Sequence, residues 1–307
     1  MYKNEISSLS NSIILPDYHL HSEFSADADA SIESIISTAR SLGMTEICIT
    51  DHYDMNFPDN PDGMTFELDM DGLIRKIGDI HSPNVLVGLE QGVMPSTCEV
   101  LNNYSSLHPG IDFIICSSHV VDGFDPYYPE YFKNPDGSYK DVKKIYMHYF
   151  EDILYNVQHF DDYNVYGHLD YIFRYVPVLL SSSGGLLEGD SVKPDKVMKM
   201  NSELFSEKFF PIIKDICHEI LTTIIKNGKG IEINTGSLYR ELDYMHPHPL
   251  ILSMYKELGG RILTFGSDAH DVTHIGYAFD EARKLAQEVG FTQYCTFRNM
   301  EAAFHEL

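Results

Sequence analysis

The sequence predicts an α/β fold in which seven parallel strands and their helices close into a TIM-like (β/α) barrel. Seven apolar, β-rich runs alternate with helix-like stretches, an order typical of a parallel sheet with helices outside it. The 307 residues show no sharp change in composition, which favours one closed barrel, and a single domain over residues 1–307 is expected. A doubly wound open sheet is the alternative, but no GxGxxG or GxxxxGK(S/T) motif follows the first strand, so a nucleotide-binding sheet is not supported.

Each expected strand is a short apolar run rich in β-branched residues. The seven runs span residues 13–19, 46–50, 85–89, 113–117, 163–166, 230–234 and 261–266. The expected helices span residues 34–42, 66–81, 97–107, 141–160, 194–226, 248–258 and 275–289. Ser31 is the candidate N-cap of the first helix, and Gly43 is placed to end it. A short strand at 292–297 is expected to precede a terminal helix. Loops are expected at residues 53–63, 120–137 and 181–190.

Composition bounds the partners and the compartment. The 46 acidic and 22 basic residues give a formal net charge of −24, which repels nucleic acid and anionic membranes and makes a phosphorylated substrate unexpected unless bound cations offset it. No apolar run approaches the roughly 20 residues of a membrane span, and the start of the chain lacks the form of a signal peptide. The five scattered cysteines include no CxxC motif and are expected to be buried free thiols. A cytoplasmic protein is therefore expected.

Histidines and acids gather where the expected strands end. His19 and His21 end the first strand, and the alternation of side chains along a strand sends both to one face. The other strand ends carry further residues of metal-ligand type: Asp51, His52, Glu90, His119, His168, Asp268 and His270. The carboxyl ends of the strands meet at one rim of a parallel barrel, so we expect these side chains to converge. Without cysteine the set suits Zn²⁺, Mn²⁺ or Fe²⁺, and it is too large for one tetrahedral ion, so two or three divalent ions are expected.

Taken together, these strand-end motifs resemble the polymerase-and-histidinol-phosphatase (PHP) superfamily. The motifs that carry the resemblance are His19-x-His21, Thr50-Asp51-His52, Gly88-Leu89-Glu90, Ser118-His119, Gly167-His168-Leu169-Asp170 and Gly266-Ser267-Asp268-Ala269-His270. They cover nearly the whole chain. The resemblance implies a distorted seven-stranded (β/α) barrel and a centre of three metal ions.

Within that superfamily the chain is similar to the histidinol-phosphatase branch. The similarity rests on the single-domain length, on Gly-His-Leu-Asp-Tyr at 167–171 followed by Arg174, and on Glu-Ile-Asn-Thr-Gly at 232–236 followed by Arg240 and His246-Pro247. It implies hydrolysis of L-histidinol phosphate to L-histidinol and phosphate in histidine biosynthesis, with a metal-bridging hydroxide as the attacking group. Arg174 and Arg240 are the candidates for clamping phosphate, since guanidinium matches phosphate geometry bidentately.

The resemblance also assigns the metal ligands. One ion would take His19, His21, Glu90 and Asp268, a second would share Glu90 and add His119 and His168, and a third would take Asp27, His52 and His270. Asp27 stands where several superfamily members have histidine, and Asp29 in the same loop is the alternative. Asp51 is expected either to orient a ligand or to be a turn or cap acid.

Other residues near the expected rim have more than one possible role. His246 or His248 is a candidate general acid for the leaving group, although the sequence His-Pro-His-Pro is also typical of a helix entry. Four loop acids are available to receive the ammonium and imidazole of histidinol phosphate: Asp54, Asp59, Asp122 and Asp125. The loop at 127–131 (YYPEY) would form a lid or wall, or would simply pack onto the barrel.

Three other functions fit part of the pattern. Another PHP phosphoesterase would act on a different small phosphate ester or on a nucleotide. A polymerase-associated nucleic-acid module conflicts with the negative charge and with the lack of a basic patch. A non-catalytic metal-binding protein would have lost several ligands, whereas every expected position holds a metal-binding side chain. The partner we expect is therefore a small phosphate monoester, without nucleic acid or membrane.

Overall fold

The computed structural model describes residues 14–80 and 84–307. Its main sheet follows one parallel path of seven strands, and a further short strand, β3 (His52–Asp54), pairs with the third of them off this path. In path order the strands are β1 (Asp17–Leu20), β2 (Ile47–Ile49), β4 (Val85–Gly92), β5 (Phe113–Ser117), β6 (Val165–Tyr166), β9 (Gly230–Asn234) and β10 (Leu263–Gly266). Ile13, at the expected start of the first strand, and His81, at the expected end of the second helix, lie outside the described residues.

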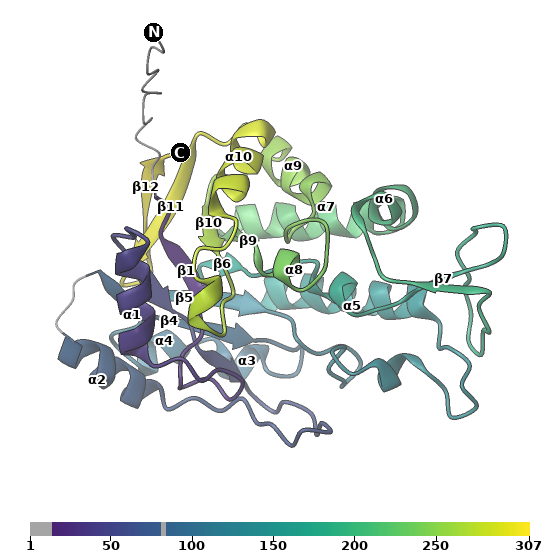
Figure 1. Ribbon diagram of the computed structural model, residues 1–307, viewed down its shortest axis with the longest axis horizontal. Coiled ribbons are helices and arrows are strands. Elements are labelled where there is room, and N and C mark those ends of the chain that lie inside the picture. The colour runs from purple at the N-terminus through teal and green to yellow at the C-terminus, as the bar shows by residue number, and fades with distance from the viewer. Residues whose placement is uncertain (1–13, 81–83) are drawn as a thin grey trace, which may run out of the picture.

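The end strands of this path, β1 and β10, lie side by side, so the sheet curves round into a nearly closed barrel (Figure 1). Just beyond β10 the Asp268 amide donates to the His19 carbonyl at 2.8 Å, and the His21 amide donates to the Ala269 carbonyl at 3.0 Å. These bonds join the first strand to the last. The predicted barrel-like α/β fold is confirmed, and the open doubly wound sheet is not what forms.

Helices connect the strands and cover the outside of the barrel (Figure 1). They are α1 (Ile32–Ser41), α2 (Met70–Ile80), α3 (Cys98–Leu101), α4 (Tyr104–Leu107), α5 (Val142–His159), α7 (Phe210–Lys226), α8 (Gly236–Tyr239), α9 (Pro249–Glu257) and α10 (Phe279–Val289). The Ser31 side chain accepts from the Ser34 amide, and Gly43 follows α1 with φ of +79°, which confirms both predicted ends of this helix. The single helix expected at 97–107 is instead the short pair α3 and α4.

The expected helix at 194–226 begins later than predicted. Its first residues form β8 (Lys196–Met198), which pairs antiparallel with β7 (Val178–Leu180) in a hairpin that projects from the barrel (Figure 1). Asn201 is the true helix start, because its side chain accepts from the Leu204 amide at 2.8 Å and caps α6 (Ser202–Leu204). A π-helical segment at Phe205–Phe209 then leads into α7. Tertiary strand pairing has overridden the local helical pattern here.

The expected terminal helix is also wrong. The chain instead forms an antiparallel hairpin of β11 (Gln293–Arg298) and β12 (Glu301–Glu306). Asn299 and Met300 connect the strands with φ of 48° and 66°, the two positive values that a two-residue type I′ hairpin requires. The hairpin is therefore set by turn chemistry that the apolar periodicity of the segment does not reveal.

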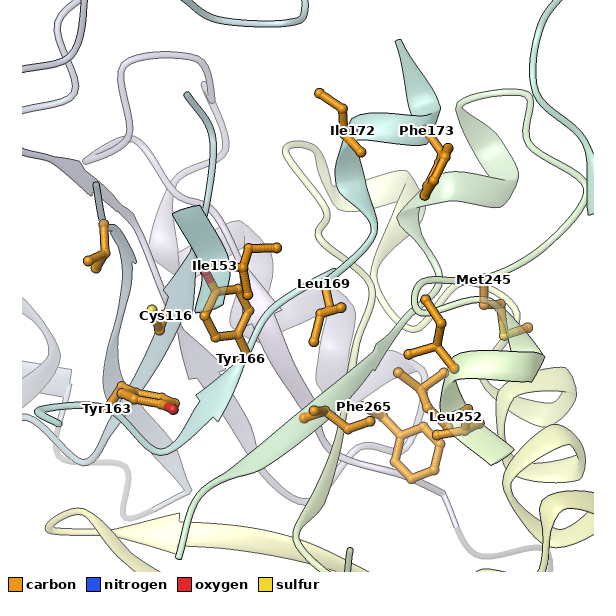
Figure 2. Packing of buried hydrophobic residues seen from close by; sticks show 14 of the residues in the cluster. Cys116, Ile153, Tyr163, Tyr166, Leu169, Ile172, Phe173, Met245, Leu252 and Phe265 are labelled. Atoms are coloured by element: carbon orange, nitrogen blue, oxygen red, sulfur yellow. The ribbon is translucent and has the colours of Figure 1, made fainter. Parts of the chain in front are cut away.

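The core has two apolar layers, one outside the sheet and one inside it. In the outer layer, Tyr166 and Phe265 of the strands lie near Ile153 of α5 and Leu252 of α9 (Figure 2). The inner layer fills the lower barrel with side chains from the strands and from β11: Tyr18, Cys48, Leu86, Phe113, Ile115, Val165, Cys295 and Phe297. All five cysteines are buried and free, as predicted. Above the inner layer the strands present polar side chains, and these form the site.

In the part of the chain that the structure describes, no helix has the length and apolar character needed to cross a bilayer.

Candidate metal centre and substrate pocket

The residues predicted as metal ligands meet at the carboxyl ends of the barrel strands. The structure brings all nine together: His19, His21, Asp27, His52, Glu90, His119, His168, Asp268 and His270. Overlapping groups of three donors, each group within 4.8 Å, include every one of them except Asp27. Asp27 joins the group through its Oδ2, which lies 3.1 Å from Nε2 of His270. Asp29, the alternative to Asp27, is exposed and does not line the pocket.

Glu90 lies at the centre of the group and is fully buried. Its Oε2 is 3.0 Å from His19 Nε2, 3.3 Å from His21 Nε2 and 3.0 Å from His52 Nδ1. Its Oε1 is 2.8 Å from His168 Nε2 and 3.1 Å from His119 Nε2. One carboxylate thus has histidine nitrogens on both of its oxygens, the arrangement expected of a ligand that two ions share.

Several of these donor atoms lie close together without forming hydrogen bonds to one another, as expected of atoms that bind a cation. His19 Nε2, His21 Nε2, His52 Nδ1 and Glu90 Oε2 are buried and have no hydrogen-bond partner among residues 14–80 and 84–307. An unpaired buried polar atom is costly, so such a cluster calls for a ligand. Donors bound about 2.1 Å from one ion would lie about 3.0–3.4 Å apart, close to the separations around Glu90 Oε2. The donor set and its spacing therefore fit bound divalent metal.

The electrostatics of the centre point to the same conclusion. Burial alone would raise the pKa of Glu90, but His19, His52 and His119 hold it well below its usual range. Burial would lower the pKa of His19, but the carboxylates of Glu232 and Glu90 raise it well above its usual value. In the metal-free chain the carboxylates thus favour the charged form of His19, whereas burial lowers the pKa of His21. A divalent cation would supply positive charge in place of the proton on His19.

Glu232 orients His19 from the side away from the centre. The His19 Nδ1–H group donates to Glu232 Oε2 at 2.9 Å, which leaves Nε2 facing Glu90. Glu232 Oε1 also accepts from the His168 amide at 2.8 Å and from Asn234 Nδ2 at 2.9 Å. The sequence placed Glu232 in a family motif without a role. Its position two residues before Asn234 on a strand, with both facing inward, is the signal that could have indicated one.

Gly266 leaves the space that this pair needs. A Cβ atom at position 266 would lie 2.4 Å from His19 Cβ and 2.7 Å from Glu232 Oε2, separations too short for non-bonded atoms. Any side chain there would push apart the imidazole and the carboxylate that orients it.

Asp51 orients His21 through a serine. Its carboxylate accepts from the Ser22 amide at 2.6 Å, from Ser22 Oγ at 2.7 Å and from Ser25 Oγ at 2.8 Å. Ser25 Oγ in turn lies 3.1 Å from His21 Nδ1. Asp51 is fully buried and does not line the pocket. This geometry favours the orienting role over that of a turn or cap acid.

Asp54 lines the pocket, as expected of a rim acid, but it also contacts a predicted metal ligand. It is buried, and its Oδ1 lies 2.8 Å from His119 Nδ1, so it orients that ligand. Asp59 is exposed and does not line the pocket, and Asp122 pairs with Tyr131 and His148. Of the four predicted rim acids, only Asp125 lines the pocket without orienting a predicted ligand.

A pocket of about 240 Å³ opens beside the ligands. The aromatic side chains that line it come from two loops and from the segment after β6: Phe57, Phe66, Tyr127, Tyr128, Tyr171 and Tyr175. Tyr128 donates to Asp62 Oδ2 at 2.8 Å and so joins the loop that follows β3 to the loop that follows β5. The predicted 127–131 loop thus contributes to a wall of the pocket through Tyr127 and Tyr128. Asp62, which the sequence did not single out, also lines the pocket.

Arg174 and Arg240 both line this pocket, as their predicted role requires. Arg240 Nη1 lies 3.2 Å from Asp268 Oδ2, and Arg174 Nη2 lies 3.6 Å from the same oxygen. Nε and Nη2 of Arg174 are buried without a hydrogen-bond partner among the described residues. Two guanidinium groups therefore stand at the edge of the centre, in a chain of strongly negative charge, and Arg174 has unused donors.

His246 and His248, the candidate general acids, do not line the pocket. His246 is fully buried, and its Nδ1 lies 2.6 Å from Asp170 Oδ1. His248 Nδ1 accepts from the Leu250 amide at 3.1 Å and caps α9, while its Nε2 is 2.9 Å from Ser202 Oγ. Both imidazoles hold loops together, so the structure gives neither of them access to a leaving group. The helix-entry interpretation of His-Pro-His-Pro is the one that the structure supports.

Comparison with known proteins agrees with this geometry. Residues 17–236 match the PHP domain. The chain is 30% identical to the histidinol-phosphatase of Lactococcus lactis, over 93% of this chain and 95% of that protein. It is 28% identical to the probable histidinol-phosphatase of Thermotoga maritima, over 90% and 92% of the two chains.

One solved structure gives a similar result. The crystal structure of the Lactococcus lactis histidinol phosphate phosphatase, complexed with zinc, L-histidinol and phosphate, superposes with a TM-score of 0.72 at 27% identity, covering 94% of this chain and 99% of that one. The match of the domain and the extent of these relatives settle the family: this chain belongs to the PHP domain family.

Proposed function

We propose that this protein is a histidinol-phosphatase, a phosphoric monoester hydrolase that converts L-histidinol phosphate to L-histidinol and phosphate. The observation that carries the proposal is the cluster of buried donor atoms around Glu90 that lack hydrogen-bond partners among the described residues, with two arginines at its edge. The Lactococcus lactis relative bears the name histidinol-phosphatase, and its solved structure holds zinc, L-histidinol and phosphate. We further propose that residues 1–307 form one domain, which acts in the cytoplasm on a small molecule and not on nucleic acid.

We propose that the centre holds two or three divalent ions, of zinc, manganese or iron. His19, His21 and Asp268 would bind one ion and His119 and His168 a second, with Glu90 shared between them. Asp27, His52 and His270 would bind a third. When bound, such ions neutralise phosphoryl oxygens and lower the pKa of water to about 7, which supplies a hydroxide nucleophile at neutral pH.

The chain's own contribution is to hold the phosphoryl group and to shape its surroundings. Arg174 and Arg240 would present N–H donors to phosphoryl oxygens bound beside Asp268. Charge that develops on these oxygens during hydrolysis strengthens the same bonds, so the arginines would stabilise the transition state more than the ground state. The aromatic side chains that line the pocket would limit the access of water to a bound phosphoryl group.

Asp125 is our candidate for the cationic end of the substrate. It lines the pocket, and its Oδ1 accepts from the Tyr127 amide at 2.8 Å, which fixes the carboxylate in place. Histidinol phosphate carries an ammonium group, and an ammonium pairs with a carboxylate between aromatic walls. A phosphate monoester whose alcohol part carries no positive charge would have no group to pair with Asp125.

The proposal is tested by measuring phosphate release from a panel of monoesters. The protein is stripped with a chelator and then reloaded with Zn²⁺, Mn²⁺ or Fe²⁺. We expect kcat/KM to be highest for L-histidinol phosphate and activity to disappear in the stripped protein. A higher kcat/KM for a nucleotide or a sugar phosphate would contradict the proposed substrate but not the metal-dependent hydrolysis. Full activity without metal would contradict the metal-dependent hydrolysis itself.

A further inference from the structure

Asp268 occupies an unusual backbone conformation for a predicted metal ligand. Its φ is +56°, in the left-handed region of backbone conformation that residues other than glycine rarely adopt. Its amide is held by the His19 carbonyl at 2.8 Å. Its carbonyl must also be held if the carboxylate is to stay aimed at the metal centre.

The Tyr239 hydroxyl makes the shortest contact to this carbonyl oxygen, which also lies 3.0 Å from His270 Nδ1. The hydroxyl oxygen lies 2.6 Å from the Asp268 carbonyl oxygen and 3.0 Å from the Ser267 carbonyl oxygen. Both carbonyls are within reach of its single proton. The same hydroxyl oxygen accepts from Arg240 Nη1 at 3.0 Å. Tyr239 is at the end of α8, half-buried, and its ring stacks on His274 with centroids 4.0 Å apart.

The guanidinium of Arg240 is fixed by the same few atoms. Its Nη1 reaches Asp268 Oδ2 at 3.2 Å and its Nη2 reaches the Asp268 carbonyl at 3.2 Å. The guanidinium carbon lies 4.7 Å from the centre of the Tyr239 ring, within range of a cation–π interaction. The Tyr239 hydroxyl thus contacts both the backbone of Asp268, a predicted metal ligand, and the guanidinium of Arg240, a predicted phosphate-binding group.

We infer that Tyr239 is a positioning residue that sets the Asp268 carboxylate and the Arg240 guanidinium in register with each other. Its hydroxyl stabilises the left-handed peptide at Asp268 through the carbonyl and orients the Arg240 fork through Nη1. The inference rests on the proposed metal centre and phosphate clamp, but not on the identity of the substrate. Metal and phosphate binding can therefore test it without any turnover.

The test compares Tyr239→Phe with Tyr277→Phe. Tyr277 packs edge-on against the Tyr239 ring, with centroids 5.4 Å apart, and is 41% exposed, so its variant controls for the loss of a nearby hydroxyl. Zn²⁺ affinity is measured by competition with a chelator, and the affinity of the zinc-loaded protein for inorganic phosphate is measured by calorimetry. Loss of a hydrogen bond at a charged group weakens an interaction roughly tenfold, and we expect a loss of about that size in both affinities for Tyr239→Phe alone.

A double variant separates the effect of Tyr239 on phosphate binding from its effect on Zn²⁺ binding. In the Arg240→Ala background, Tyr239→Phe should no longer affect phosphate affinity but should still weaken Zn²⁺ binding, because only the second effect acts through Asp268. Equal affinities in Tyr239→Phe and Tyr277→Phe would overturn the inference, as would an undiminished effect on phosphate without Arg240. Failure of the proposed substrate assay with both affinities lowered would leave this inference standing and reject only the substrate.

Circular dichroism and thermal unfolding of the metal-free proteins check that the variants fold. If Tyr239→Phe does not fold, a ring-fluorinated tyrosine at 239 keeps the shape of the ring and makes the hydroxyl oxygen a poorer acceptor. Phosphate affinity should then fall in the folded, zinc-loaded protein. An unchanged phosphate affinity in that protein would overturn the role of Tyr239 in orienting Arg240.

Discussion

The imidazole of His19 and the carboxylate of Glu232 lie 2.9 Å apart, although 213 positions separate them in the chain. The contact fixes which nitrogen of His19 faces the metal centre. It exists only because β1 and β9 are both parts of one barrel, in which β10 lies between them. The orientation of a ligand at one end of the chain is therefore decided by an acid near the other.

Glu232→Gln should weaken metal binding without unfolding the protein. The amide keeps the size of the side chain but removes the charge that favours the Nδ1–H form of His19. Loss of such an outer partner typically costs 10–100-fold in metal affinity, and we expect a loss of about that size. Competition with a chelator measures it, and Glu33→Gln, at an exposed glutamate paired with Lys76, is the matched control. Equal affinities in the two variants would contradict the orienting role.

Metal binding should release protons at neutral pH. The pKa of His119 is raised well above its usual value because the attraction of Asp54 and Glu90 outweighs burial, and the pKa of His19 is raised by Glu232 and Glu90. These shifts favour the cationic form of both imidazoles, with a proton on each nitrogen, and a metal that binds one nitrogen must displace its proton. Metal affinity should rise as the pH rises through neutrality. Calorimetry in buffers of different ionisation enthalpy counts the protons, and a heat independent of buffer would contradict this account.

Arg240→Ala should raise KM and lower kcat/KM sharply. A bidentate, charge-assisted contact to phosphoryl oxygens stabilises by about 3–4 kcal/mol, so a fall of roughly 100- to 1,000-fold in kcat/KM is expected. Steady-state kinetics of phosphate release measures the change. Arg40→Ala, at an exposed arginine in the last turn of α1, is the control. An unchanged kcat/KM would remove Arg240 from the site.

Asp125→Asn should change which monoesters the protein prefers. It removes the negative charge that we assign to the substrate ammonium, so KM for L-histidinol phosphate should rise about tenfold, as expected for loss of a charge-assisted hydrogen bond. KM for glycerol phosphate, which has no cation, should stay nearly constant. Asp59→Asn, at an exposed acid outside the pocket, is the control. A similar rise in KM for both substrates would argue for a general effect on the pocket.

The barrel and the convergence of the predicted ligands at one rim could be predicted because both depend on local patterns. A strand end is visible as the end of an apolar run, and parallel strands bring their ends together whatever lies between them. His19, Glu90 and Asp268 are therefore found by their place on strands. Their family motifs add the choice of ligand.

The residues that orient those ligands could not be predicted in the same way. Asp54 was expected only as a rim acid, yet it also contacts His119, because β3 is a strand and not the start of a loop. The pairing of His246 with Asp170 joins residues 76 positions apart, and no periodicity indicates it. The terminal hairpin depends on two positive φ angles at Asn299 and Met300, which are properties of the turn alone.

The closure of the barrel between β1 and β10 has a consequence for how the protein is made. His19, His21 and Glu90 leave the ribosome early, whereas Asp268 and the floor residue Phe297 are synthesised late. Until then Glu90 has only some of the side chains that surround it in the folded protein. The inner apolar layer of the barrel is also incomplete. The proposed metal site is therefore complete only after the last strands of the barrel have been made and have closed against β1.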